Sequence, residues 1–245
     1  MNRCWLAAVR LGSELVRRAQ AFASVMEAKR AAIYGGTFDP LHNGHLKVAR
    51  RVQKLFGLDE LFFVPACVPP HKRGAGISSA FHRFAMLALA TQQDEPLRVS
   101  TVELDSPERP YAVETVARMQ EQLGADYRLF FVMGADSWSE ITTWREWRGL
   151  LTMCDHIVVT RPRYELNKPE AVGNLIDLRG KTDDEISALV SESESSRVFV
   201  TDAVFEDVSA TAIRAAARQG DTGALRKMVP PEVASYIEKY RLYRN

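Results

Sequence analysis

Between residues 31 and 56 an apolar run, a glycine turn and a helical pattern follow one another. The apolar run, residues 31–34, predicts a short buried strand. Gly35 and Gly36 then allow a sharp turn in which the backbone can approach a ligand closely. Apolar residues recur at helical spacing from Leu46 to Phe56. This order places the free N–H groups of a helix start over the carboxyl end of a strand, and such groups bind anions.

His42 and His45 lie at the expected start of this helix, three residues apart. Side chains at that spacing share one face of a helix, so both imidazoles can donate hydrogen bonds to the same phosphate group. The simpler interpretation is that they only cap and pack the helix, because short motifs often occur by chance. Taken alone, the pair is compatible with both interpretations.

The string from Gly35 to His45, G-G-T-F-D-P-L-H-N-G-H, resembles the signature of the nucleotidyltransferases that carry an H-x-G-H motif. The resemblance implies that this loop binds the phosphates of a nucleotide. The string does not match G-x-G-x-x-G, the glycine pattern of the folds that bind hydride carriers. A nucleotide substrate is therefore expected here, and a dinucleotide redox cofactor is not.

Strands and helices are expected to alternate along the rest of the chain. Further strands are predicted at residues 60–64, 97–104, 128–133 and 156–160 and within 197–205, and helices at residues 81–92, 111–123, 183–190, 212–218 and 233–243. The remainder of residues 163–196 is polar and irregular. This alternation predicts an α/β fold, a doubly wound parallel sheet of the Rossmann type with a small helical portion at the C-terminus.

Two loops after predicted strands carry further candidate residues. In Val68-Pro-Pro-His-Lys72 the prolines stiffen the backbone ahead of Lys72, and a lysine held in this way can act as a point charge on phosphates. The alternative is a solvated loop lysine. Gly134 and Asp136 follow the strand at 128–133, where ligands of open parallel sheets gather. Asp136 could accept a hydrogen bond from a ribose hydroxyl, could cap the next helix, or could do both.

A second string, S-A-T-A-I-R from Ser209 to Arg214, places two hydroxyls at an expected helix start and a guanidinium one turn later. These groups suit a triphosphate, although helix capping alone would explain Ser209 and Thr211 in isolation. The string resembles the S-S-T-x-I-R box of the same family, with Ala210 in place of a serine. Two such strings in the family's order form a more specific signal than either string alone.

The strings P-P-H-K and G-A-D-S and the pair Trp144 and Trp147, expected on one helix, resemble the bacterial nicotinate-nucleotide adenylyltransferases over residues 30–245. The resemblance implies that nicotinate mononucleotide attacks the α-phosphorus of ATP, giving deamido-NAD and pyrophosphate in NAD biosynthesis, with Mg²⁺ accompanying the ATP. It implies that Trp144 lies against the nicotinate ring, while Trp147 packs within the protein.

Residue roles follow from the same resemblance. His42, His45, Lys72 and Arg214 are the expected catalytic residues. The expected ATP-binding residues are Gly35, Gly36, Thr37, Phe38, His42, His45, Gly134, Asp136, Ser209, Thr211 and Arg214, and the expected nicotinate mononucleotide-binding residues are Thr37, Lys72, Tyr111, Ala112 and Trp144. No protein nucleophile, general base or metal-binding carboxylate cluster is evident, so Mg²⁺ is expected on phosphates and water.

The region before Tyr111 departs from the family pattern. Relatives read G-P-S-Y-T there, whereas this chain has Pro110 and Ala112 on either side of Tyr111. The strictness for nicotinate over nicotinamide mononucleotide therefore stays open. Other acceptors, such as phosphopantetheine, and a non-catalytic nucleotide sensor are the alternative readings, although the presence of both histidines, Lys72 and Arg214 argues against lost chemistry.

Composition narrows the remaining possibilities. The 245 residues carry a formal net charge of +1, which argues on electrostatic grounds against a general nucleic-acid binder. Three scattered cysteines favour a reducing cytoplasm, and no apolar run is long enough for a membrane helix. Residues 1–29 form a basic extension, either a loosely docked helix or a product of a misplaced start, and 30–245 a single domain. The oligomeric state stays open, a homo-oligomer included.

Overall fold

The computed structural model describes residues 28–67, 77–106, 110–160, 172–191, 196–202 and 208–244. The strands in this part of the chain are β1 (Lys29–Gly36), β2 (Glu60–Pro65), β3 (Leu97–Val99), β4 (Tyr127–Gly134), β5 (Asp155–Val159), β6 (Leu175–Asp177) and β7 (Val198–Thr201). The helices are α2 (Asn43–Phe56), α3 (Ala80–Thr91), α4 (Ala112–Leu123), α5 (Ala135–Ser139), the 3₁₀ helix η1 (Ile141–Thr143), α6 (Trp147–Met153), α7 (Asp183–Ser191), α8 (Ala210–Gln219), α9 (Thr222–Met228) and α10 (Pro231–Lys239).

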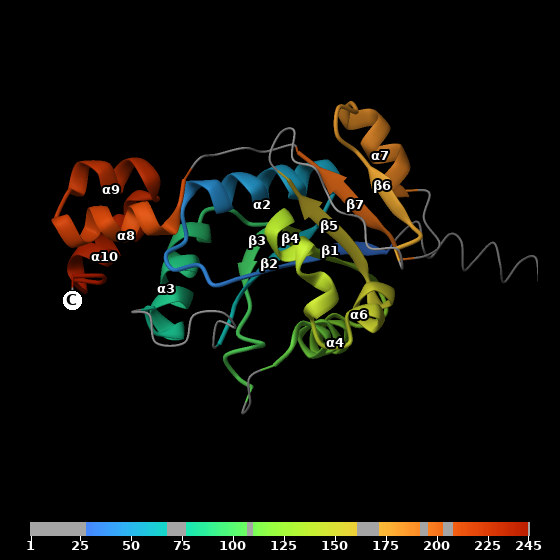
Figure 1. Ribbon diagram of the computed structural model, residues 1–245, viewed down its shortest axis with the longest axis horizontal. Coiled ribbons are helices and arrows are strands. Elements are labelled where there is room, and N and C mark those ends of the chain that lie inside the picture. Colours follow the sequence, from blue (N-terminus) through green and yellow to red (C-terminus); the bar gives the residue numbers. More distant parts are fainter. Residues whose placement is uncertain are drawn as a thin grey trace, which may run out of the picture.

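The strands form one sheet in the order β3-β2-β1-β4-β5-β7-β6, and every pairing is parallel. The chain order reverses direction between β1 and β4, which pair with each other at the middle of the sheet. The predicted doubly wound α/β fold is confirmed (Figure 1). In such a sheet, ligands bind outside the carboxyl ends of the strands where the order reverses.

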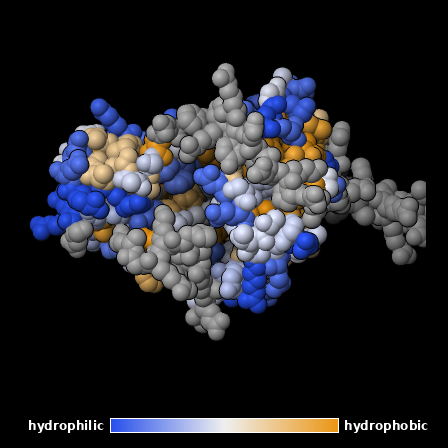
Figure 2. All heavy atoms as spheres, viewed as in Figure 1, coloured by the Kyte–Doolittle hydropathy of each residue, from blue (hydrophilic) through white to orange (hydrophobic). Residues whose placement is uncertain are grey.

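Helices cover both faces of the sheet. Ala32 of β1 joins the apolar cluster beneath α2 and α7, whereas Ile33 joins the cluster that includes residues of α4, α5 and α6. This alternation explains why the central strands read as continuous apolar runs, since a parallel sheet buries both of its faces. Hydrophilic residues form much of the coloured surface in Figure 2, with apolar residues in smaller patches between them.

The C-terminal helices α8, α9 and α10 form a third apolar cluster with Met86 of α3, at one end of the sheet (Figure 1). The predicted C-terminal helical portion is therefore confirmed, but α9 was not predicted and α10 ends at Lys239 rather than at residue 243. Arg241 and Tyr243 have positive φ angles of 50° and 67°. The chain turns there instead of continuing the helix, because these angles are incompatible with a right-handed helix.

The predicted strand at 97–104 is wrong beyond Val99. The chain leaves the sheet in a turn, in which the N–H of Asp105 donates to the carbonyl of Thr101 over 2.9 Å. Leaving the sheet brings Glu103 to α4, where the hydroxyl of Thr115 donates to its carboxylate over 2.9 Å. The short strand β6 was also missed, because it pairs with β7 alone and at the edge of the sheet.

The prediction that Trp144 and Trp147 share one helix is wrong as well. Trp144 follows η1 in an extended conformation with φ −76° and ψ 145°, and Trp147 is the first residue of α6. Between them, Glu146 has a φ of 52°, which breaks the helical path. The two indoles are therefore placed independently, by separate elements.

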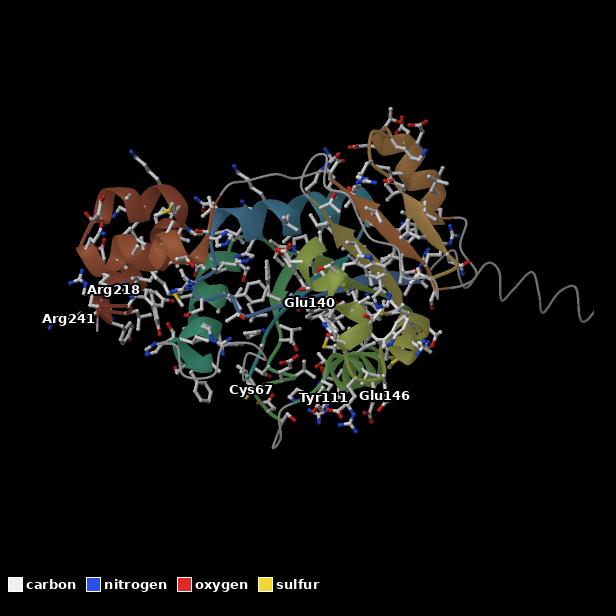
Figure 3. All side chains as sticks on the ribbon, in the orientation of Figure 1. Cys67, Tyr111, Glu140, Glu146, Arg218 and Arg241 are labelled. Atoms are coloured by element: carbon white, nitrogen blue, oxygen red, sulfur yellow. The ribbon has the colours of Figure 1, made fainter. Side chains whose placement is uncertain are left out.

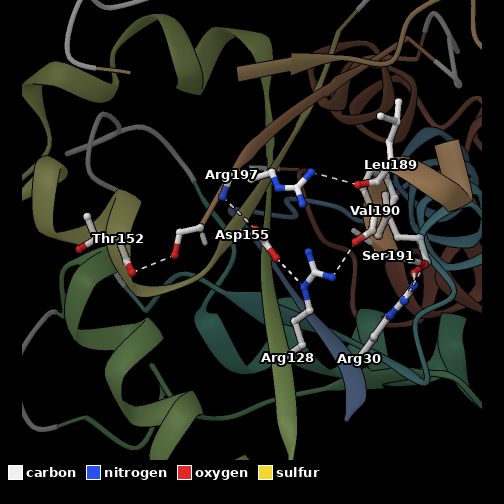
Figure 4. Close-up of polar contacts among 10 residues, drawn as sticks. Arg30, Arg128, Thr152, Asp155, Leu189, Val190, Ser191 and Arg197 are labelled. Atoms are coloured by element: carbon white, nitrogen blue, oxygen red, sulfur yellow. Dashed lines mark hydrogen bonds and ion pairs between the residues drawn. The ribbon is translucent and has the colours of Figure 1, made fainter. Parts of the chain in front are cut away.

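At the amino ends of the central strands, arginines bind the C-terminus of α7 (Figure 4). Arg128 donates to the Asp155 carboxylate over 2.7 Å and to the carbonyl of Val190 over 2.6 Å. Arg197 donates to the carbonyl of Leu189 over 3.1 Å. Cations at a helix C-terminus satisfy its free carbonyls and oppose its dipole. This network stabilises the side of the sheet at which the strands begin, opposite their carboxyl ends. No helix among the described residues has the length and apolarity needed to cross a bilayer.

Candidate functional site

The loop between β1 and α2 folds back over the end of β1. The ring of Phe38 lies so close to Gly36 that a Cβ there would come within 2.8 Å of it, which excludes any other residue without rearrangement. Phe38 itself is buried, has a φ of 50°, and contacts His45 edge-on with 5.0 Å between ring centroids. Gly36 is therefore required by the packing of this loop. The turn expected at Gly35 and Gly36 is wrong, because both glycines are still paired within β1 and the chain turns after them.

His42 and His45 are arranged as a pair at the start of α2. His42 is the N-cap residue, and its backbone N–H donates to Nδ1 of His45 over 3.3 Å. The two rings stack with 3.6 Å between centroids. Because Nδ1 of His45 accepts a hydrogen bond, the neutral ring carries its proton on Nε2, which is then a donor. Burial, together with the charge of His42, lowers the pKa of His45 well below its usual value, so this imidazole is neutral near pH 7.

The second string packs against the first. Ser209 is the N-cap of α8, and its hydroxyl accepts a hydrogen bond from the N–H of Ala212 over 3.2 Å. Arg214 donates to the backbone carbonyl of Asp39 over 2.7 Å and to the hydroxyl of Thr211 over 3.3 Å. Asp39 belongs to the β1–α2 loop, 175 residues earlier in the sequence. The capping interpretation of Ser209 is thereby confirmed, and the structure brings the two strings together.

Asp39 joins three segments of the chain. Its side chain is 3% exposed, and Oδ1 accepts hydrogen bonds from the N–H of Ser78 over 3.2 Å and from the hydroxyl of Tyr243 over 2.8 Å. Nη1 of Arg214 lies 4.0 Å from Oδ2. The carboxylate thus connects the β1–α2 loop with the segment before α3 and with the C-terminal tail. Its position inside the first string gave no sign of this role.

Arg83 connects the β1–α2 loop with the segment before α3 and with the residues after β2, and it was not among the predicted site residues. It is 1% exposed and donates to the carbonyls of Thr37, Ala66, Cys67 and Ser78 at 2.6–3.3 Å. The planar guanidinium, with five donors, suits this role. A sequence signal did exist, because an arginine stands three residues before Met86 on the apolar face of the predicted helix. Buried arginines are rare unless their donors are bound.

A pocket of about 470 Å³ opens at the carboxyl ends of β1 and β4. Of the predicted site residues, Gly35, Gly36, Thr37, Tyr111, Ala112, Gly134, Asp136 and Trp144 line it. The other predicted residues that the structure describes do not line it and belong to the adjacent β1–α2 loop, to the first turn of α2 and to the start of α8: Phe38, His42, His45, Ser209, Thr211 and Arg214. Lys72 lies outside the described residues. The candidate site thus has two parts, the pocket and the neighbouring loop with its histidines.

Three predictions about the pocket residues can be compared with the structure. Gly134, not Asp136, is the N-cap of α5, so the capping role considered for Asp136 is wrong. Trp144 is partly buried and packs edge-on against Phe131 with 6.4 Å between ring centroids. Tyr111 is the N-cap of α4 and is 46% exposed. Figure 3 shows Tyr111 near Glu146, with Glu140 closer to the middle of the sheet.

Acidic residues also line the pocket. Glu103, Asp136 and Glu140 lie in its wall, and Glu103 accepts hydrogen bonds from Thr115 and from the N–H of Cys67. Among the described residues, no three His, Cys, Asp or Glu side chains come together as a metal site.

The sequence matches the cytidylyltransferase-like family over residues 33–216. A probable nicotinate-nucleotide adenylyltransferase of Pseudomonas putida (strain W619) is 36% identical over 216 residues, covering 88% of this chain and 95% of the relative. Another from Thermoanaerobacter sp. (strain X514) is 34% identical over 88% of this chain and 94% of its own length. The fold is similar to Plasmodium falciparum nicotinic acid mononucleotide adenylyltransferase complexed with NaAD, with a TM-score of 0.65, 20% identity, and coverage of 88% of this chain and 97% of that one.

Proposed function

The chain belongs to the cytidylyltransferase-like family, among the nicotinate-nucleotide adenylyltransferases, and we propose that it transfers the adenylyl group of ATP to nicotinate mononucleotide in NAD biosynthesis. The products are deamido-NAD and pyrophosphate. The observation that carries the proposal is the hydrogen bond from Arg214 to the carbonyl of Asp39, which joins the two family strings beside the pocket. Neither string by itself would distinguish phosphate binding from helix capping.

The reaction needs no protein nucleophile. An oxygen of the nicotinate mononucleotide phosphate forms a new bond to the α-phosphorus of ATP, and the bond from that phosphorus to the bridging oxygen breaks. The electron pair leaves with pyrophosphate. Because the attacking phosphate is already an anion, no proton has to be removed first. The protein's task is to hold two anions in line and to neutralise the charge that develops on the transferring group.

The residues at the start of α2 suit that task. Nε2–H of the neutral His45 is the proposed donor to the α-phosphate, with His42 and the first N–H groups of α2 beside it. Thr211, Arg214 and the start of α8 would hold the β- and γ-phosphates. Lys72 is proposed for a neighbouring phosphate on sequence grounds alone. Gly35 and Gly36 end β1, and Thr37 and Phe38 begin the loop that leads from it to the histidines.

The pocket would then hold the acceptor nucleotide and the ribose. Trp144 is the proposed partner of the nicotinate ring, with Tyr111 and Ala112 across from it at the start of α4. Asp136 and Gly134, which also line the pocket, are the proposed partners of a ribose hydroxyl of the ATP-derived part. Mg²⁺ would enter with ATP, shielding the phosphates, and no protein ligand is assigned to it.

The domain organisation, the cellular location and the binding partners are proposed on the same basis. Residues 30–245 would form one nucleotidyltransferase domain preceded by an extension at 1–29. The near-zero net charge gives no general attraction to nucleic acid, and the scattered cysteines favour the cytoplasm. ATP and nicotinate mononucleotide are therefore the proposed partners, and size-exclusion chromatography of the full chain measures whether it forms a homo-oligomer.

The test is pyrophosphate release from Mg-ATP with nicotinate mononucleotide and nicotinamide mononucleotide in parallel. Release that is much more efficient with the acid supports the proposal. Equal efficiency would keep the reaction and remove the claimed preference. If pyrophosphate is released with phosphopantetheine but with neither pyridine nucleotide, the enzyme has another substrate. ATP binding without release in any of these reactions would indicate a nucleotide sensor.

A further inference from the structure

Charge in the pocket is unevenly distributed. Among the described residues that line it, three are acidic, Glu103, Asp136 and Glu140, and one is basic, Arg145. Carboxylates in a partly closed pocket repel a second anion, because the protein wall screens charge less than bulk water does. The proposed acceptor carries two anionic groups, its phosphate and its ring carboxylate. A ligand of that kind needs a compensating cation on the pocket wall.

Arg145 is held in place by its guanidinium plane rather than by its donors. The guanidinium carbon lies 4.8 Å from the centroid of the Tyr111 ring, which is stacking distance. Its nearest carboxylate contacts are 3.5 Å to Glu146 and 4.0 Å to Glu114, and neither is a hydrogen bond. Within the described part of the chain, Arg145 makes no hydrogen bond. Its N–H donors are thus available at the pocket.

The other arginines of the site differ in this respect. Arg83 donates to four backbone carbonyls, and Arg214 to Asp39 and Thr211. Arg145 therefore combines a stacked guanidinium with donors that, among the described residues, form only the longer ion pairs to Glu114 and Glu146. A guanidinium with free N–H groups binds a planar carboxylate through two parallel hydrogen bonds. Such an arrangement is typical of a carboxylate receptor.

We infer that Arg145 selects the acid form of the acceptor by binding its ring carboxylate. The inference rests on the proposed function, because it assumes a pyridine nucleotide in the pocket. Arg145 directly follows Trp144, the proposed ring partner, whereas the phosphate is proposed to lie at the β1–α2 loop. Nicotinate and nicotinamide mononucleotides share the phosphate and ribose and differ only in the ring substituent. A residue that binds this substituent separates the two acceptors.

The test compares kcat/KM for the two acceptors in the wild type and in R145Q. The Gln variant should lose roughly 10- to 100-fold with nicotinate mononucleotide, the usual range for a lost charge-assisted pair, and stay within about threefold with the amide. The loss should appear mainly in KM, because the carboxylate is remote from the reacting phosphorus. The kcat/KM of R145K with nicotinate mononucleotide should lie between those of the wild type and R145Q. Lysine keeps the positive charge but cannot form two parallel hydrogen bonds with a carboxylate.

Arg148 provides a matched control. Its guanidinium also stacks on an aromatic ring, 4.4 Å from the centroid of Trp147, but it does not line the pocket. R148Q should leave the ratio of the two acceptors unchanged. Calorimetric binding of nicotinate mononucleotide without ATP gives an independent reading, and R145Q should weaken it by the same factor. Thermal unfolding of each variant shows whether the fold is retained.

The outcomes separate the two proposals. If the wild type releases pyrophosphate with neither acceptor, the proposed function fails and the inference fails with it. If the wild type prefers the acid and R145Q keeps the same preference, only the inference is overturned. Equal loss of both acceptors in R145Q also overturns it, because Arg145 would then act through the shared phosphate or through the shape of the pocket.

Discussion

The hydroxyl of Tyr243 donates a 2.8 Å hydrogen bond to Oδ1 of Asp39, across 204 residues of sequence. Asp39 lies three residues before His42, so this contact ties the C-terminal tail to the loop that presents the histidines. Burial and the Asp39 charge raise the pKa of Tyr243, so the phenol stays protonated and remains the donor. The tail is therefore part of the structure that positions the proposed phosphate site.

Tyr243→Phe removes this hydroxyl and leaves the ring. We expect a loss of about 2 kcal/mol in the free energy of unfolding, because a buried carboxylate loses one of its donors. We also expect lower turnover, since the β1–α2 loop loses an anchor. Urea unfolding and pyrophosphate release measure the two effects. Tyr240→Phe is the control, because Tyr240 is 49% exposed and packs on Tyr236 without contacting Asp39. Equal behaviour of the two variants would contradict the anchoring role.

His45→Ala should lower kcat by about 10²- to 10³-fold, which corresponds to about 3–4 kcal/mol for one lost donor to developing charge. KM for ATP should change less, because the interaction is strongest in the transition state. Steady-state pyrophosphate release gives both constants. His82→Ala is the matched histidine control, since His82 hydrogen-bonds to Tyr236 on α10 and lies outside the site. Near-normal turnover of His45→Ala would remove the assignment of His45.

Arg83→Met should destabilise the protein by about 3 kcal/mol or more. The substitution keeps the apolar stem but leaves four carbonyl groups without their buried donor. Chemical denaturation measures the loss. Arg50→Ala is the comparison, because Arg50 forms an exposed pair with Asp94 at 2.7 Å and such pairs contribute less than about 1 kcal/mol. A small effect of Arg83→Met would mean that water replaces the guanidinium without cost.

His156 makes stability depend on pH. It is fully buried in β5, beside Phe131, and burial lowers its pKa from 6.5 to about 4. The unfolded chain thus binds a proton between these values that the folded protein does not bind, so stability falls as pH drops from 6.5 towards 4. This group alone should remove about 2 kcal/mol between pH 7 and pH 5.

His156→Phe tests this dependence. The variant has no titrating ring at this position, so the difference in unfolding free energy between pH 7 and pH 5 should shrink by about 2 kcal/mol. His45 also has a lowered pKa, but it is present in both proteins and cancels in the comparison. Parallel pH dependence of the wild type and the variant would show that His156 is neutral in both folded and unfolded chains, or charged in both.

Local signals were sufficient for most of the secondary structure. Apolar runs predicted β1, β2, β4, β5 and β7, and the hydroxyl of Ser209 predicted the start of α8. These features depend on residues within one or two turns of each other, so they can be read from the chain alone. Elements that were missed or overextended, among them β3, β6, α9 and the end of α10, are short, and their limits depend on neighbours far away in sequence.

The residues of the candidate site also differ in whether local sequence signals identified them. The sequence alone identified the glycines at the end of β1, the histidine pair and the second string with Arg214. Tertiary structure decided that Arg214 meets Asp39, that Arg83 and Tyr243 support the same loop, and that Trp144 and Arg145 stand apart from α6 beside a pocket. A buried carboxylate or guanidinium is stable only where distant segments supply its partners, and the order of residues along the chain does not contain that information.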